Sequence, residues 1–189
     1  MESLEKDRQL QQLIDECAEG NAAAQKKIFE QYMPPMLRLA QRFTEDSMEA
    51  EDMVMIGFYK VFQKINSFNA SGSFEAWMKA IIINSAITIY RKNQKRLKQD
   101  SLCEWFDQAT EAHNKTNTDY LYLAINSLPK EFAMNFSLYA IEGYSHQEIG
   151  RKMQISPALS KVRVSRARKA LRYNLRREEE SQIYIPSYN

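Results

Sequence analysis

The sequence predicts an all-α protein made of two small helical domains that a flexible linker joins. Its 189 residues include only five glycines and five prolines and few runs of β-branched residues, so the composition favours helices. Apolar residues recur at helical spacing in two blocks, over 1–93 and 119–177. Between them, residues 94–118 are polar and show no sustained period, which is typical of a linker.

The first block opens with two helices. Gly20 can end a helix over about 4–17, because glycine tolerates the left-handed conformation at a helix end, and Asn21 can cap the next helix. The adjacent Pro34 and Pro35 are expected to break or kink that second helix, since proline lacks the amide hydrogen that a helix needs.

Two longer helices complete the first block. The third, over about 48–65, carries a row of apolar residues on a single face. These residues are Val54, Phe58, Val61, Phe62 and Ile65. The segment 66–73 is a loop by composition, and Ser73 can cap a fourth helix that runs from 74 to about 93. Trp77 in this helix is expected to pack in the interior.

The second block begins with a helix near residue 119 that ends at Leu128, because the residue before a proline disfavours helical backbone. Another helix follows, and Gly143 can end it. The last residues, 178–189, are expected to form a tail, since they show no helical pattern after an acidic triplet.

The end of the second block has the layout of a helix-turn-helix. Ser145 and Glu148 have the spacing of a capping box, in which each side chain bonds the backbone amide of the other residue. Residues 154–156 form a short turn, Ser156 can cap the next helix, and Pro157 suits its first turn. In this motif the second helix enters the major groove of DNA.

The charge distribution supports DNA as a partner. The stretch 144–177 holds ten basic residues against one acid, a net charge of +9, whereas the whole chain carries only +2. The remaining residues therefore sum to −7, and a basic field confined to one segment is an electrostatic footprint for phosphate groups. A solvated basic helix on a membrane or in a coiled coil is the alternative, but the apolar stripe of this helix is narrow.

Other classes of protein are less consistent with the sequence. The N-terminus is charged and lacks the apolar core of a signal peptide, and no apolar run is long enough to span a membrane, so we expect a cytoplasmic chain without membrane insertion. Cys17 and Cys103 are isolated, and His113 and His146 are far apart and expected at the surface. We therefore predict no cofactor, no metal site and no catalytic residues, and thus no enzyme.

The order and spacing of these features resemble a bacterial RNA polymerase sigma factor of the extracytoplasmic-function (ECF) group in the sigma-70 family. The resemblance covers about 20–93 and 120–175. The segment EAEDMVMIGFYKVFQKINSF resembles the helix that docks on RNA polymerase, and GSFEAWMKAIIINSAITIYRK resembles the segment that recognises the promoter −10 element. The segments LPKEFAMNFSLYAIEGYSHQEIG and SRARKAL resemble the domain that recognises the −35 element.

The resemblance implies a promoter-specificity subunit without an active site of its own. Residues 1–93 would be a sigma region 2-like helical bundle, and 119–177 a sigma region 4-like helix-turn-helix domain. Its partners would be core RNA polymerase, promoter DNA and an anti-sigma factor that masks the polymerase-facing surfaces. The alternative is a stand-alone helix-turn-helix transcription regulator with a ligand or dimerisation domain, in which the segment 84–92 would have no role.

Helical spacing divides the last helix into two faces. Ser160, Val164, Ala167 and Leu171 are expected to face the domain core. The residues predicted to meet the −35 element are Ser156, Lys161, Val162, Arg163, Ser165, Arg166, Arg168 and Lys169. Lys161 and Arg166 can donate to guanine, whereas Val162 can offer only a methyl contact to thymine. The residues expected to anchor phosphates are Arg163, Arg168, Lys169 and Arg172.

The resemblance also places contacts to the −10 element. The residues concerned are Asn69, Ser71, Gly72, Asn84, Ser85, Thr88, Arg91 and Lys92. Asn84 can both donate and accept, as an exposed base edge requires, although a local backbone hydrogen bond is its alternative. The loop 66–73 matches the family loop that captures an extruded base, and Arg91 and Lys92 are placed to hold phosphates.

The polymerase-docking helix departs from the family pattern. The predicted docking residues are Glu49, Asp52, Met55, Ile56 and Tyr59. The family usually has Gln-Glu where this chain has Met55 and Ile56, which either form an apolar anchor or pack inward. In the later turn the usual glycine is Gln154, and the family Gly-Thr is replaced by Ala158-Leu159, so promoter preference does not carry over from a relative.

Overall fold

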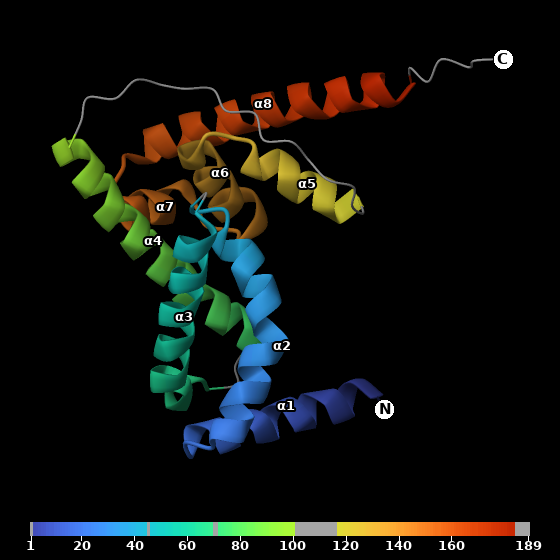
Figure 1. Ribbon diagram of the computed structural model, residues 1–189, viewed down its shortest axis with the longest axis vertical. Coiled ribbons are helices and arrows are strands. Elements are labelled where there is room, and N and C mark those ends of the chain that lie inside the picture. The colour runs from blue at the N-terminus through green and yellow to red at the C-terminus, as the bar shows by residue number, and fades with distance from the viewer. Residues whose placement is uncertain (1, 45, 70–71, 101–116, 184–189) are drawn as a thin grey trace. The chain divides into compact units, whose positions relative to one another are not determined.

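The computed structural model describes residues 2–44, 46–69, 72–100 and 117–183, and within these ranges the secondary structure is entirely helical. The chain divides into two compact units, Met1–Lys95 and Arg96–Asn189 (Figure 1). The helices of the first part are α1 (Glu2–Ala18), α2 (Ala22–Ala40), α3 (Ser47–Lys64) and α4 (Phe74–Asp100). Those of the second part are α5 (Asn117–Asn126), α6 (Lys130–Phe136), α7 (His146–Met153) and α8 (Pro157–Ile183), with a π-helical turn at Ser137–Ile141.

The predicted caps of the first unit are confirmed. The Asn21 side chain accepts hydrogen bonds from the amides of Ala23 and Ala24 at 2.9 and 3.2 Å. The hydroxyl of Ser73 accepts one from the amide of Ala76 at 3.4 Å. Each cap satisfies an amide at the start of a helix that has no partner within that helix.

The first unit packs α2 against α1 and α3. Helices α3 and α4 approach closely at Gly57, where an added Cβ would lie 2.7 Å from Cγ1 of Ile82. Met78, Ile82 and Ile83 of α4 are buried, as are Met53 and Phe58 of α3. The apolar face that the sequence predicts for the third helix therefore faces the core.

Of the break or kink expected at the two prolines, the break is wrong. Helix α2 continues through Pro34 and Pro35 to Ala40. Met36 and Leu39 beyond them are buried, so the tertiary packing of this face offsets the backbone hydrogen bonds that the prolines cannot donate.

The fourth helix is longer than the sequence predicts. It ends at Asp100 rather than near Asn93, so the first residues of the expected linker are helical. Gln, Lys, Arg and Leu dominate this extension and are good helix formers, which hydrophobic periodicity does not register. The tail differs similarly, because α8 continues to Ile183.

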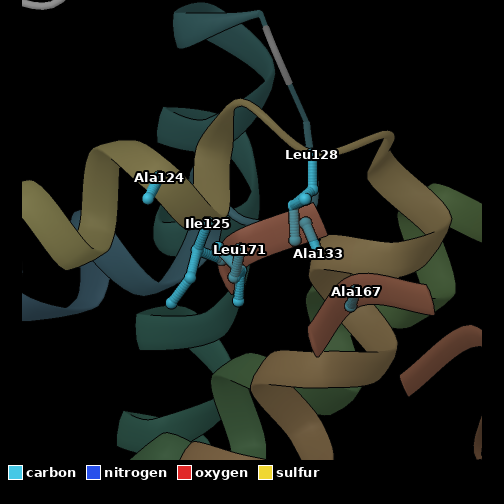
Figure 2. Close-up of a cluster of buried hydrophobic side chains, with 6 residues drawn as sticks. All are labelled: Ala124, Ile125, Leu128, Ala133, Ala167 and Leu171. Carbon is cyan, nitrogen blue, oxygen red and sulfur yellow. The ribbon is translucent and has the colours of Figure 1, made fainter. Parts of the chain in front are cut away.

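The second unit has its own apolar core, to which α5, α6 and α8 contribute (Figure 2). Its buried residues are Ala124, Ile125, Leu128, Ala133, Ala167 and Leu171. Helix α8 packs against α5, α6 and α7, and the core therefore fixes which face of α8 remains outside.

Candidate nucleic-acid and protein interfaces

The capping box at the start of α7 is present as predicted. The amide of Glu148 donates to the Ser145 hydroxyl at 3.2 Å, and the amide of Ser145 donates to the Glu148 carboxylate at 2.8 Å. Hydrogen bonds from the side chain and backbone of Ser145 lower the pKa of Glu148 below its ordinary value, with smaller contributions from the nearby Lys152 and Arg151. The reciprocal bonds fix the point at which the helix-turn-helix begins.

The turn between α7 and α8 is tight. Gln154 adopts the left-handed conformation, with φ 57° and ψ 44°, and is the one residue besides glycine with positive φ in the described segments. The amide of Ile155 donates to the carbonyl of Gly150 at 3.0 Å, and a Cβ on Gly150 would lie 2.8 Å from the carbonyl oxygen of Ile155. The Ser156 hydroxyl then accepts from the amide of Leu159 at 3.1 Å and starts α8.

The predicted division of α8 into two faces is confirmed. Ser160, Val164, Ala167 and Leu171 are buried. The predicted DNA-facing residues that lie exposed on the remaining surface are Ser156, Lys161, Val162, Ser165, Arg166, Arg168 and Lys169. From Lys161 onward, the exposed part of α8 is therefore basic, a surface that suits the phosphates and base edges of a major groove.

Arg163 requires a correction. Its Nη2 lies 2.6 Å from Oε2 of Glu131 in α6, and its side chain is only 14% exposed. This charge-assisted hydrogen bond ties α8 to α6, so Arg163 does not present its guanidinium to a phosphate as predicted. Sequence spacing could not have revealed the partner, because Glu131 lies on a different helix.

His146 also differs from the expected surface histidine. Its ring stacks on Tyr139, with centroids 4.3 Å apart and planes within 8°, and its Nδ1 lies 3.1 Å from the buried hydroxyl of Ser160. The guanidinium of Arg168 lies over the Tyr139 ring, 5.4 Å from the ring centre. Ser160 was the sequence feature that could have indicated a half-buried partner, since a hydroxyl buried in an apolar stripe needs a hydrogen bond.

The predicted −10 residues on α4 divide between surface and interior. Asn84 and Thr88 are exposed, and the Thr88 hydroxyl donates to the carbonyl of Asn84 at 2.7 Å. Ser85 is buried, donates to the carbonyl of Ile81 at 3.0 Å and accepts from Lys60 of α3 at 3.1 Å. The prediction that Ser85 meets DNA is therefore wrong, because its hydroxyl links α3 to α4.

The remaining −10 residues lie in the preceding loop and in the second half of α4. Asn69, Gly72 and Lys92 are exposed, and Arg91 is half-buried, whereas Ser71 lies outside the described residues. The expected interior position of Trp77 is met only in part. Its half-buried ring packs against Phe68 and Phe74, with centroids 5.5 and 5.6 Å away.

The outer face of α3 carries large apolar side chains. Met55 is 55% exposed, Ile56 is 42% exposed and Tyr59 is 64% exposed, so the alternative in which Met55 and Ile56 pack inward is wrong. Met48, which the sequence analysis did not single out, is 76% exposed near the start of the same helix. An exposed apolar patch of this kind is characteristic of a protein interface.

Acidic residues accompany this apolar face. Asp52 is exposed, whereas Glu49 is half-buried and accepts a hydrogen bond from the side chain of Asn93 in α4. Glu49 thus helps to hold α3 against α4, in addition to the docking role predicted for it.

Other kinds of site are not evident in the described part of the chain. It contains no cluster of three or more His, Cys, Asp or Glu residues suited to a metal ion. Burial raises the pKa of the Cys17 thiol. Among the described helices, none combines the length and apolar character that a membrane span requires.

Together, these features define a two-domain protein whose described residues form helices, with exposed faces on α3 and α4 in the first domain and a helix-turn-helix in the second. The model of the family described as Sigma-70 region 2 matches residues 28–96, and that of Sigma-70, region 4 matches residues 118–171. The chain belongs to the sigma-70 family of RNA polymerase sigma factors, in its ECF group. A stand-alone helix-turn-helix regulator is not favoured, because such a protein has no counterpart of region 2.

Relatives of known identity agree with this family. The ECF RNA polymerase sigma factor SigE of Mycolicibacterium smegmatis is 28% identical over 82% of this chain. The RNA polymerase sigma-H factor of Pseudomonas aeruginosa and the ECF sigma-E factor of Escherichia coli are 25% and 23% identical, each over 85% of this chain. The chain spans 64% of the length of the first relative and 91% of the length of the other two.

A solved structure shares the fold. The chain is similar to the sigma factor RpoE from Bartonella quintana, solved in complex with the anti-sigma factor NepR. The TM-score is 0.52 with 22% sequence identity, over 80% of this chain and 96% of that chain.

Proposed function

We propose that this protein binds core RNA polymerase through α3 and directs transcription initiation by reading the −10 element with α4 and the −35 element with α8. The observation that carries the proposal is the division of α8, which buries an apolar stripe and leaves its cations outside. The protein acts in the cytoplasm with the polymerase and contributes no catalytic group of its own, since the chemistry of RNA synthesis belongs to the core enzyme.

Transcription with purified components tests this function. The protein is added to core polymerase, and initiation is measured on a set of promoters. We expect promoter-specific transcripts only when both components are present. If the core gains no specific initiation while the protein alone binds duplex DNA tightly, the proposed function is wrong.

The apolar face of α3 is the proposed polymerase contact. Burying an exposed large apolar side chain in a protein interface contributes about 1.5–3 kcal/mol. We therefore expect Met55→Ala and Ile56→Ala each to weaken binding to core polymerase by roughly tenfold or more without changing the stability of the free protein. Lys64→Ala, at an exposed position on the last turn of the same helix, is the matched control and should leave the affinity unchanged.

Neighbouring residues of α4 test the −10 assignment. Asn84 is exposed and Ser85 is buried, so the same substitution should act differently at the two positions. We expect Asn84→Ala to impair duplex opening, measured by permanganate reactivity of unpaired thymines, while core binding is retained. Ser85→Ala should instead lower the free energy of unfolding by about 1 kcal/mol, because it removes the partner of Lys60. An Asn84→Ala protein that no longer binds core would contradict the assignment.

An anti-sigma factor is the proposed regulatory partner. The related RpoE was solved with an anti-sigma factor, and the exposed apolar face of α3 is a surface that such a protein can mask. Affinity purification from cells of origin, with and without competing core polymerase, tests whether a bound protein and the polymerase exclude each other.

A further inference from the structure

The first turns of α8 expose two apolar side chains within a basic surface. We propose that Leu159 and Val162 read the C5-methyl groups of neighbouring thymines in the −35 duplex. This inference rests on the proposed contact between α8 and the −35 element, and it adds Leu159 to the residues that determine promoter specificity.

The two side chains share the outer face of the helix. Leu159 is 39% exposed and Val162 is 44% exposed, although both are large and apolar. They lie three positions apart in the sequence, which places them on one face about 4.5 Å apart along the helix axis. Ser160, which follows Leu159, is fully buried and faces the domain core. Its burial fixes the rotation of this turn, so Leu159 and Val162 face away from the core.

The helix cap holds Leu159 in place. Its amide donates to the hydroxyl of Ser156 at 3.1 Å, and Pro157 restricts the backbone of the first turn. A side chain whose backbone is ordered before binding loses less conformational entropy when it contacts a ligand. Leu159 is therefore a preorganised apolar contact rather than part of a mobile helix end.

The surrounding charges select the ligand. Lys161 and Arg166 are exposed beside the two apolar residues and attract a polyanion. Leucine and valine side chains cannot form hydrogen bonds with phosphates or polar base edges. The C5-methyl group of thymine is the one apolar group in the major groove that they can contact. A cationic surface with an apolar centre thus matches a duplex segment that contains thymine.

The spacing indicates which thymines are read. Base pairs are stacked about 3.4 Å apart, and the two side chains are about 4.5 Å apart along α8, so together they can reach one base pair or two neighbouring base pairs. Arg166 lies one turn beyond Val162 on the same face, from where it can donate to a guanine. We expect an element in which one or two thymines lie next to a guanine that Arg166 reads.

The experiment uses the holoenzyme and begins by selecting active promoters from a library randomised at the −35 element. Each thymine of the selected element is then replaced by deoxyuridine, which keeps the base pair and its O4 acceptor and removes only the methyl group. Since a buried methyl-sized group contributes about 0.8 kcal/mol, we expect about fourfold weaker promoter binding at one or two positions.

Variants assign the effect to the two residues. Leu159→Ala and Val162→Ala holoenzymes should bind the thymine promoter more weakly and should no longer distinguish thymine from deoxyuridine at the matching position. Leu121→Ala is the control, because Leu121 is also apolar and is 45% exposed, on α5. Leu121→Ala should leave the fourfold preference for thymine over deoxyuridine intact. Urea unfolding should show that all three variants are as stable as the original protein.

Three results would overturn the proposal. They are a selected −35 element without thymine, a wild-type holoenzyme that is indifferent to deoxyuridine, and variants that still discriminate. In each case, promoter-specific transcription that still depends on Lys161 and Arg166 would leave the proposed function standing. Loss of all promoter-specific transcription would instead contradict the proposed function.

Discussion

Arg163 and Arg166 are three residues apart on α8 but have different surroundings. Arg163 is paired with Glu131 at 2.6 Å, whereas Arg166 is exposed on the basic face. We expect Arg163→Ala to lower the free energy of unfolding by about 1–2 kcal/mol, because it removes a charge-assisted hydrogen bond to a partly exposed carboxylate. Urea unfolding of the free protein measures this effect.

Arg166→Ala should show the opposite pattern. Its stability should remain within about 0.5 kcal/mol of the original, as at most surface positions. Promoter binding by the holoenzyme should weaken by roughly 1–3 kcal/mol, with reduced preference for the base that Arg166 reads. An equal loss for every −35 sequence would make Arg166 a phosphate anchor instead.

Glu148 gives the fold a pH dependence whose direction follows from its pKa. Hydrogen bonds from Ser145 lower that pKa from its ordinary value of 4.5. The carboxylate therefore stabilises the folded state fully above pH 4.5, and this contribution is lost as the pH falls through the lowered pKa. We expect the stability difference between the original protein and Glu148→Gln to shrink across this range, as measured by thermal unfolding from pH 7 to pH 3. A difference that stays constant with pH would contradict this role.

Between elements, the turn of the helix-turn-helix contains one strained residue, Gln154, and Gly150 of α7 packs closely against this turn. Gln154 has φ 57°, which a glycine adopts without a Cβ clash, so Gln154→Gly should stabilise the protein by up to about 1 kcal/mol. Gly150→Ala would place a Cβ 2.8 Å from the Ile155 carbonyl. Overpacking costs about 1–3 kcal/mol and exceeds the gain of about 1 kcal/mol in helix propensity, so this variant should be less stable.

Chemical denaturation of the two turn variants checks these opposite signs. Gly72→Ala is the comparison, because a Cβ at Gly72 would meet no atom within 4 Å and its backbone is not left-handed. If Gly150→Ala proved as stable as Gly72→Ala, the close approach at the turn would not exist in solution.

Most helices and their caps could be predicted from the sequence, since both depend on residues close together along the chain. Asn21, Ser73 and Ser145 all cap as predicted. The continuity of α2 through Pro34 could not be predicted, because the buried face that stabilises it packs against other helices. The end of α4 was missed for a different reason, since polar helix-forming residues show no hydrophobic period.

Across the whole molecule, charge is divided between a basic segment and an acidic remainder. Residues 144–177 carry +9 while the rest of the chain carries −7. Promoter affinity should therefore fall with increasing salt, and the slope of the logarithmic plot should decrease by about one when an exposed phosphate-binding cation is removed. Lys169→Ala tests this on the holoenzyme, and its affinity for core polymerase should remain unchanged. An unchanged salt slope would show that Lys169 binds no phosphate.

The sequence by itself determined the helical class, the helix-turn-helix and the two faces of α8, because capping and periodicity are local properties. The tertiary structure alone decided which polar residues of those faces remain available. In the tertiary structure, the buried Ser85 accepts a hydrogen bond from Lys60, and Arg163 pairs with Glu131. Met55 is exposed on the outer face of α3. Each of these outcomes depends on which distant helix packs alongside, and the pattern within one helix does not specify its neighbour.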